Sequence, residues 1–447
     1  MALLPQRPEI FLKMILAIVF AIIGAAFGSI YFFGPEKFSF EHLLFSLWAL
    51  AVSLAQLRLS PYEEPFTNKF WLVLICFFVL FYLIYKVTKE YFSKRFKDEG
   101  KEWGINGWLA MIALSVLTLL SLGANYYIFN RFGTLPILST IPDKMRFIIN
   151  REVFGLWEYA SLLPRIFIPL AFIYLAISKI QWWKRLFLVS DIVLGFFLLS
   201  LYASRLIIVI TILLCFFSYL IISLKKISFK KTILSALIAV ISVLTVSVSI
   251  PAVRQYITYK DYYSDIEYTP FTYLADLSQI KVPERYNFLI PLYLIPSFNL
   301  QAMMRATDFF SFTENRFYFG TYSLSALDPA LKLVHLKEFD VIIPWKAMFL
   351  PWWVTATFLF NFWADFGYLG IVLAAVFLGL ILGFSYSWAT KKTSLGSVML
   401  FAYLSFVVVM SIYTNYFMRP EMYLDLVLIL ILGLAMGNQE RVFPTTE

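Results

Sequence analysis

The sequence is poor in charge, histidine and cysteine. Of 447 residues only 15% are charged, against about 25% in an average soluble domain, and there are two histidines and two cysteines. Cys76 and Cys215 both fall within apolar runs, so we interpret them as helix-packing residues without a redox or metal role. A Gly-rich phosphate loop, an HExxH motif and a CxxC pair are all missing. We therefore expect no nucleotide-driven reaction, no cofactor and no metal.

Hydrophobic residues make up 61% of the chain, against about 45–50% in soluble domains. Apolar runs of about 20 residues recur, and each is long enough to cross a hydrocarbon core of about 30 Å. The first run is too long for the core of a signal peptide. We predict an all-α polytopic membrane protein with about 11 transmembrane helices, within a range of about 10–12. The predicted spans are 10–33, 41–58, 70–86, 105–129, 164–179, 186–201, 206–224, 232–250, 367–389, 396–415 and 421–437.

The basic residues predict the topology. Short basic connectors occur at 85–97, 179–185, 225–231 and 391–392. Because Lys and Arg concentrate in short cytoplasmic loops, these four should face the cytoplasm, which puts the N-terminus outside and the C-terminus inside. The expected location is the cytoplasmic membrane. The net charge of +9 then reflects loops that face anionic lipid, and nucleic acid is not expected as a partner.

Three regions follow from this topology. Residues 1–250 form an N-terminal bundle of about eight spans, residues 251–352 a large extracytoplasmic loop, and residues 353–447 the C-terminal spans. The loop holds nine Lys and Arg, ten Asp and Glu, and ten Tyr, and it is far longer than a connector. We expect it to contain short helices. The stretch 347–363 fits a partial or re-entrant helix.

Arg205 lies in "YASRLIIVITILL" (202–214), directly after the turn that separates the spans 186–201 and 206–224. A buried guanidinium without a partner costs several kcal/mol, so snorkelling to the headgroups is one explanation. The predicted outer face holds further arginines, and arginine binds phosphate oxygens in a bidentate manner. The set favours a lipid-linked phosphate or diphosphate at headgroup height. These arginines are Arg151, Arg165, Arg254, Arg285, Arg305, Arg316 and Arg419.

The tyrosines of the large loop offer a second kind of contact. Aromatic rings stack on the apolar faces of sugars, and phenols hydrogen-bond to hydroxyl groups. An interfacial aromatic belt is the alternative for any single tyrosine. Ten tyrosines with interleaved charges favour a saccharide surface.

Three stretches resemble the O-antigen and exopolysaccharide repeat-unit polymerases of the Wzy type. "ASR" (203–205) is similar to a small-small-Arg turn between two central spans. "FYFGTYSLSAL" (317–327), followed by "IIPWK" (342–346), resembles the outer-loop pattern of that family. "TATFLFNFWADFGYLGIVLAAVFLGLILG" (355–383) resembles the stretch that leads into the next span.

The resemblance implies a membrane glycosyltransferase of GT-C-like architecture. Such an enzyme transfers a glycan from undecaprenyl diphosphate to a sugar hydroxyl of an incoming lipid-linked repeat unit, at the outer face of the membrane. It also implies a lipid-linked oligosaccharide substrate, contact with membrane lipids, and a flippase and a chain-length regulator as partners. The departing diphosphate develops negative charge, which fixed cations stabilise.

Five residues are candidates for the chemistry. Arg205 and Arg254 are expected to stabilise the leaving diphosphate. Glu314, His335 and Asp365 are candidate bases for the acceptor hydroxyl. His335 has no recognisable partner pattern around it, although related ligases use a histidine in a comparable outer region. Asp365 fits a base, a hydroxyl acceptor or an ion-pair partner for an arginine, and pairing is favoured over direct chemistry.

A further set is expected to bind the substrate. For its loop arginines a structural salt bridge is an equal alternative, because Asp308 and Glu314 lie beside them in the sequence. Asp265 and Glu267 have a metal-binding spacing, but one such pair arises readily by chance, so no metal is expected. The set consists of Arg285, Arg305, Arg316, Tyr318, Tyr322 and Arg151.

Two other functions remain open at this point. An O-antigen ligase would share the donor and differ in the acceptor. A transporter for lipid-linked saccharide would need ionisable residues midway through several spans. Asp191 and Asp425 are the main residues of that kind.

Overall fold

Helices dominate the computed structural model of the chain. The named strands in the described residues are β1 (Trp103–Gly104) and β2 (Gln439–Glu440), which form one short antiparallel pair. The structure describes residues 7–96, 103–139, 144–145, 148–149, 156–177, 180–202, 204–223, 234–243, 245–246, 249, 270–310, 317–325, 349–350, 353, 355–436 and 439–440.

Within this described part, seven helices are long and apolar enough to cross a membrane, which confirms an all-α protein of the multi-pass membrane type. Other expected spans also fold as helices, but they are shorter or carry more charge. These are α8 (Trp182–Leu201), α17 (Leu395–Met410), α18 (Pro420–Met436) and Leu234–Val243. The total of 11 spans stays a prediction. The seven are Leu12–Phe33 of α1 (Arg7–Phe33), α2 (Phe40–Leu57), α3 (Asn68–Arg95), α4 (Gly107–Phe132), Leu156–Ile177, α9 (Arg205–Ile222) and α16 (Tyr368–Lys391).

The chain divides into two compact units. The first unit consists of Met1–Arg95, Phe271–Tyr386 and Val407–Tyr423, and the second of Phe96–Pro270, Ser387–Phe406 and Leu424–Glu447. Each unit therefore combines early and late parts of the sequence.

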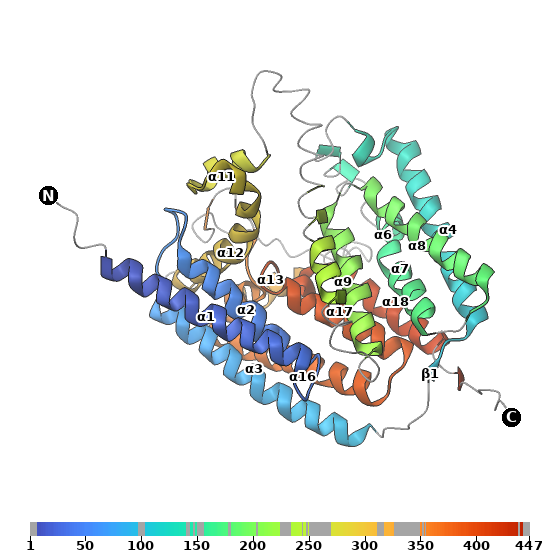
Figure 1. The fold of residues 1–447 in the computed structure, drawn as a ribbon, viewed down its shortest axis with the longest axis horizontal. Coiled ribbons are helices and arrows are strands. Elements are labelled where there is room, and N and C mark those ends of the chain that lie inside the picture. Colours follow the sequence, from blue (N-terminus) through green and yellow to red (C-terminus); the bar gives the residue numbers. More distant parts are fainter. Residues whose placement is uncertain are drawn as a thin grey trace. The chain divides into compact units, whose positions relative to one another are not determined.

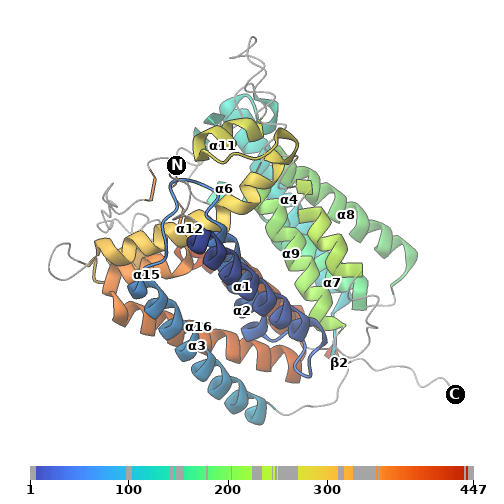
Figure 2. The same cartoon turned by 60° about the vertical axis from the view of Figure 1, so that its left-hand side comes forward.

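In the first unit α1 packs along α2, and α2 also contacts α3 (Figures 1 and 2). The approach of α1 to α2 is close, because a Cβ on Gly24 would lie 2.7 Å from the side chain of Leu50. The hydroxyl of Ser46 donates to the carbonyl of Gly24 at 2.8 Å. Hydrogen bonds of this kind join apolar helices where water is absent.

Opposite ends of the first unit carry separate polar groups. At one end Lys89 pairs with Glu36 at 2.5 Å, and Lys86 pairs with Glu41 at 3.0 Å. At the other end the turn between α2 and α3 meets α12 (Ile290–Phe309). By the charge rule the first of these ends faces the cytoplasm, and α12 then lies at the outer end. This orientation is a prediction.

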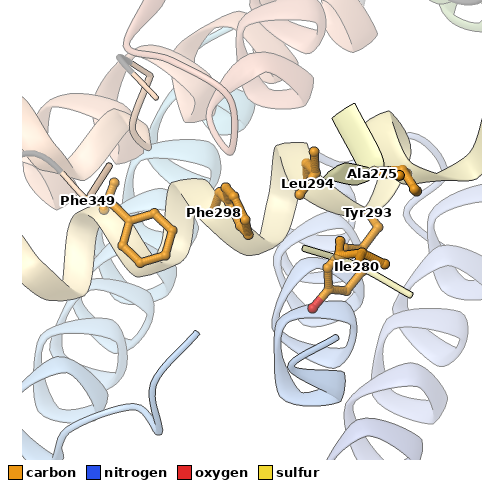
Figure 3. Close-up of a cluster of buried hydrophobic side chains, with 8 residues drawn as sticks. Ala275, Ile280, Tyr293, Leu294, Phe298 and Phe349 are labelled. Atoms are coloured by element: carbon orange, nitrogen blue, oxygen red, sulfur yellow. The ribbon is translucent and has the colours of Figure 1, made fainter. Parts of the chain in front are cut away.

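Helix α12 lies in the region expected to be a loop of short helices, and with 20 residues it is longer than expected. It packs against α2, α3 and α15 (Phe358–Phe366) and buries Ser297, Asn299 and Gln301 among its apolar residues. Figure 3 shows the apolar side of this packing, in which side chains along α12 meet α11 (Pro270–Ser278) and Phe349. The buried polar residues explain why the sequence does not read as a span.

The second unit is built around α7 (Pro164–Ile177), which packs against α4, α8 and α9. A short helix, α6 (Leu156–Ser161), precedes α7 and packs against α4. A hydrophobic core that includes Ile128, Leu162 and Tyr202 joins the end of α4 to the start of α7 and the end of α8. Arg205 begins its helix beside this core.

Candidate functional site

Asp365, a candidate base, acts as a helix cap in the first unit. Its side chain is fully buried, and its two oxygens accept backbone N–H groups from Tyr322 at 3.0 Å and Ser323 at 2.8 Å. The hydroxyl of Ser323 donates to the same carboxylate. Tyr322 and Ser323 lie in the first turn of the short helix α13 (Thr321–Leu324). A carboxylate at a helix start accepts hydrogen bonds from backbone N–H groups that would otherwise have no partner. The geometry therefore assigns Asp365 a positioning role.

The residues around α13 form what we term the aromatic segment, residues 317–325. The end of α15 holds it by two backbone hydrogen bonds, from Tyr318 N–H to the carbonyl of Ala364 and from Phe319 N–H to that of Asp365, each 3.0 Å long. Gly367 has a φ of +59°, and a Cβ there would lie 2.7 Å from the ring of Phe317. Only glycine fits without strain where the segment lies this close to the chain.

Tyr318 and Tyr322, both predicted to bind substrate, stack on each other with ring centroids 5.8 Å apart. The ring of Phe310, at the end of α12, contacts Tyr318. The ring of Phe360, in α15, contacts Tyr322. The tyrosine pair therefore packs against apolar rings from both helices. Burial, with the nearby charge of Asp365, raises the pKa of both phenols. Both hydroxyls therefore stay protonated and able to donate at neutral pH.

A second buried carboxylate, Glu63, joins the turn between α2 and α3 to α12. It accepts hydrogen bonds from Ser60 N–H at 2.8 Å, from the Tyr293 hydroxyl at 2.5 Å, and from the Ser297 hydroxyl. The Tyr293 hydroxyl in turn accepts from Leu59 N–H at 2.8 Å. Burial outweighs these donors and raises the pKa of Glu63 to about 7. No local sequence pattern predicts this cluster, because Glu63 and Tyr293 are 230 positions apart.

Arg305 and Arg285, the described arginines among the substrate-binding candidates of the large loop, have different surroundings. Arg305 donates to the carbonyl of Phe349 at 3.0 Å and thereby ties this residue to α12. The guanidinium of Arg285 lies over the ring of Tyr286, with its central carbon 4.8 Å from the ring centroid. Both side chains are exposed. Each of the two arginines therefore contacts a neighbouring residue of the same unit, Phe349 for Arg305 and Tyr286 for Arg285.

Arg205 lies in the second unit and is the first residue of α9, directly after the break that follows α8. The sequence prediction of this helix start is confirmed. Its side chain is half-buried, and Ser204 is the N-cap residue. The N-terminus of an 18-residue helix carries a partial positive charge, so backbone and guanidinium favour an anion at the same place.

Arg165 differs from the outer arginines with which the sequence grouped it. It is 2% exposed and pairs with Asp425, with Nη2 at 3.0 Å and Nε at 3.2 Å from Oδ1. The Tyr159 hydroxyl at 3.1 Å and the Tyr403 hydroxyl at 2.7 Å complete the shell of the carboxylate. This buried network gives both charged residues a structural explanation.

Five predicted site residues lie outside the described residues: Arg151, Arg254, Glu314, Arg316 and His335. The structure brings Asp365, Tyr318 and Tyr322 together in the first unit, and it describes Arg205 in the second. Within the described part of the chain, His, Cys, Asp and Glu residues form no cluster of three that would hold a metal ion.

Comparison of the chain with family models, with curated proteins and with solved structures finds no match.

Proposed function

We propose that the chain is a membrane glycosyltransferase that polymerises oligosaccharide repeat units carried on undecaprenyl diphosphate, at the outer face of the cytoplasmic membrane. The acceptor hydroxyl attacks the anomeric carbon of the donor sugar. The bond from that carbon to the carrier phosphate breaks, the diphosphate leaves with the electron pair, and the hydroxyl proton passes to a base.

The observation that carries the proposal is the position of Arg205 at the N-terminus of α9. A lipid-linked diphosphate lies at the boundary between hydrocarbon and water, where the end of an apolar helix also lies. A guanidinium at this boundary stabilises the negative charge that develops on the leaving diphosphate. Fixed cations of this kind lower a barrier by several kcal/mol, on the order of 3–4 kcal/mol for one donor.

The aromatic segment supports the saccharide half of the proposal. The Asp365 carboxylate fixes its backbone at Tyr322 and Ser323, and the rings of Tyr318 and Tyr322 stack on each other. A preorganised surface loses less entropy on binding than a mobile one. Protonated phenols beside apolar rings match the hydroxyl groups and C–H faces of a sugar.

A transport function has less support, because Asp425 is already paired with Arg165. The ion pair neutralises one of the two mid-span acids on which the hypothesis of a transporter depends. A ligase shares the donor, so its separation from a polymerase depends on the product.

The test is complementation of a deletion strain, with the glycan separated by gel electrophoresis. Wild-type protein should restore a ladder, and Arg205→Ala should leave single repeat units on the carrier while its amount in the membrane stays normal. Arg205→Lys should restore only part of the ladder, because lysine lacks the planar fork. Arg131→Ala is the matched control, since this exposed arginine ends α4.

Two results would contradict the proposal. A normal ladder from Arg205→Ala would remove the assigned role of the guanidinium. A deletion strain that still makes a ladder, but no longer attaches it to its final acceptor, would indicate a ligase.

A further inference from the structure

Phe319 has a backbone conformation that phenylalanine rarely adopts. Its φ is 52°, in the left-handed region, which costs a residue with a side chain about 1–2 kcal/mol. The next residue, Gly320, has a φ of 90°. Strain of this kind persists only where the surroundings enforce it, and it is concentrated at functional sites.

The surroundings of Phe319 do enforce it. Its N–H donates to the carbonyl of Asp365, and the carboxylate of the same residue holds the N–H groups of Tyr322 and Ser323. A Cβ on Gly320 would lie 3.2 Å from the ring of Phe366. The chain is thus fixed on both sides of Phe319 by contacts that do not involve its side chain.

The side chain that this conformation presents is 63% exposed. Packing within the unit therefore does not account for a phenylalanine at a position that suits glycine or asparagine better. Its sequence neighbour Tyr318 belongs to the stacked pair that supplies protonated phenol groups. A segment that combines an exposed flat ring with phenol hydroxyls has the composition of a surface that binds a pyranose ring.

We propose that Phe319 is a substrate-contact residue that stacks on a sugar ring of the lipid-linked glycan, and that Asp365 is the positioning residue that fixes it. This inference rests on the proposed function and names the part of the substrate that the aromatic segment binds. The alternative contact for an exposed ring at a membrane boundary is a lipid chain, and the test distinguishes contact with lipid from contact with sugar.

The probe is the single-repeat carrier lipid that the deletion strain accumulates, added to washed membranes that contain each variant. Phe319→Ala and Phe319→Leu should raise KM about tenfold, the effect of losing roughly one ring contact, with kcat changed less than about threefold. Phe319→Trp should keep KM within about threefold of wild type. Phe288→Ala is the matched control, because Phe288 is 43% exposed in the same unit and has no left-handed backbone.

Phe319→Gly separates binding from folding. Glycine adopts the left-handed conformation without strain, so the unfolding midpoint of this variant should equal or exceed that of wild type. Its KM should still rise about tenfold, as for alanine. A residue with a purely structural role would instead lower the midpoint.

Three outcomes would overturn the inference. Unchanged KM in the alanine and leucine variants would show that the ring does not contact substrate. Normal KM for leucine with raised KM for alanine would indicate a lipid anchor, which needs apolar area but no flat face. A Phe319→Gly variant with normal KM would contradict it even if alanine misfolds. Failure of the proposed function looks different, because wild-type membranes would then not elongate the probe at all.

Discussion

Replacing Arg165 by methionine should destabilise the second unit strongly. Methionine fills a similar volume but leaves the carboxylate of Asp425 without a cation. Within the described part of the chain, the Tyr159 hydroxyl at 3.1 Å and the Tyr403 hydroxyl at 2.7 Å remain as its donors. Both charged side chains are almost fully buried, so water does not replace the lost guanidinium.

The magnitude follows from the two hydrogen bonds that disappear. Each N–H bond to a charged group contributes about 1.5–3 kcal/mol, so the loss is about 3–6 kcal/mol. Breaking one partner of a buried pair costs about 3–5 kcal/mol in other proteins, which agrees. The double variant Arg165→Met with Asp425→Leu should lose only about 2 kcal/mol, because the unpaired charge is gone and only the two tyrosine hydroxyls lack an acceptor.

The assay is the free energy of unfolding of the purified full-length chain in detergent micelles, for both single variants and the double variant. Arg131→Met is the control, and its stability should equal that of wild type because this side chain is exposed. A stable Arg165→Met protein without activity would refute the structural role and return Arg165 to the set of phosphate-binding arginines. A double variant as unstable as the single variants would show that the two charges do not interact.

Two further predictions concern the first unit. Since burial raises the pKa of Glu63 from 4.5 to about 7, the folded state binds the proton more tightly, and stability should fall by up to about 3 kcal/mol as the pH rises from about 4.5 to 7. Glu63→Gln should abolish this slope in unfolding midpoints measured across that range, and an unchanged slope would contradict the assignment. In a cysteine-free chain, Gln279→Cys should react with an impermeant maleimide added to intact cells and Glu36→Cys should not. The reverse pattern would invert the predicted topology.

Local sequence features determined which parts of this structure could be predicted. Apolar runs and the break before Arg205 depend on neighbouring residues, and the helices of the structure follow them. Helix α12 was not predicted as a long helix, because its buried Ser297, Asn299 and Gln301 make it resemble a polar loop. Their hydrogen bonds to distant residues make this burial possible, and Gln301 exchanges two with the backbone of Glu64. No local pattern encodes such partners.

The same limit explains why the sequence does not predict the partners of three charged residues. The sequence groups Arg165 with the phosphate-binding arginines and places Asp425 among the mid-span acids, whereas the two neutralise each other across 260 positions. Asp365 was considered as a base, whereas its oxygens are occupied by donors from residues about 43 positions earlier. In each case the residue type suggested chemistry and the unseen partner supplied a structural reason. Phe319 differs, because packing within the first unit does not require a strained, exposed backbone position. The functional proposals are assigned to Phe319 and to Arg205, the first residue of α9.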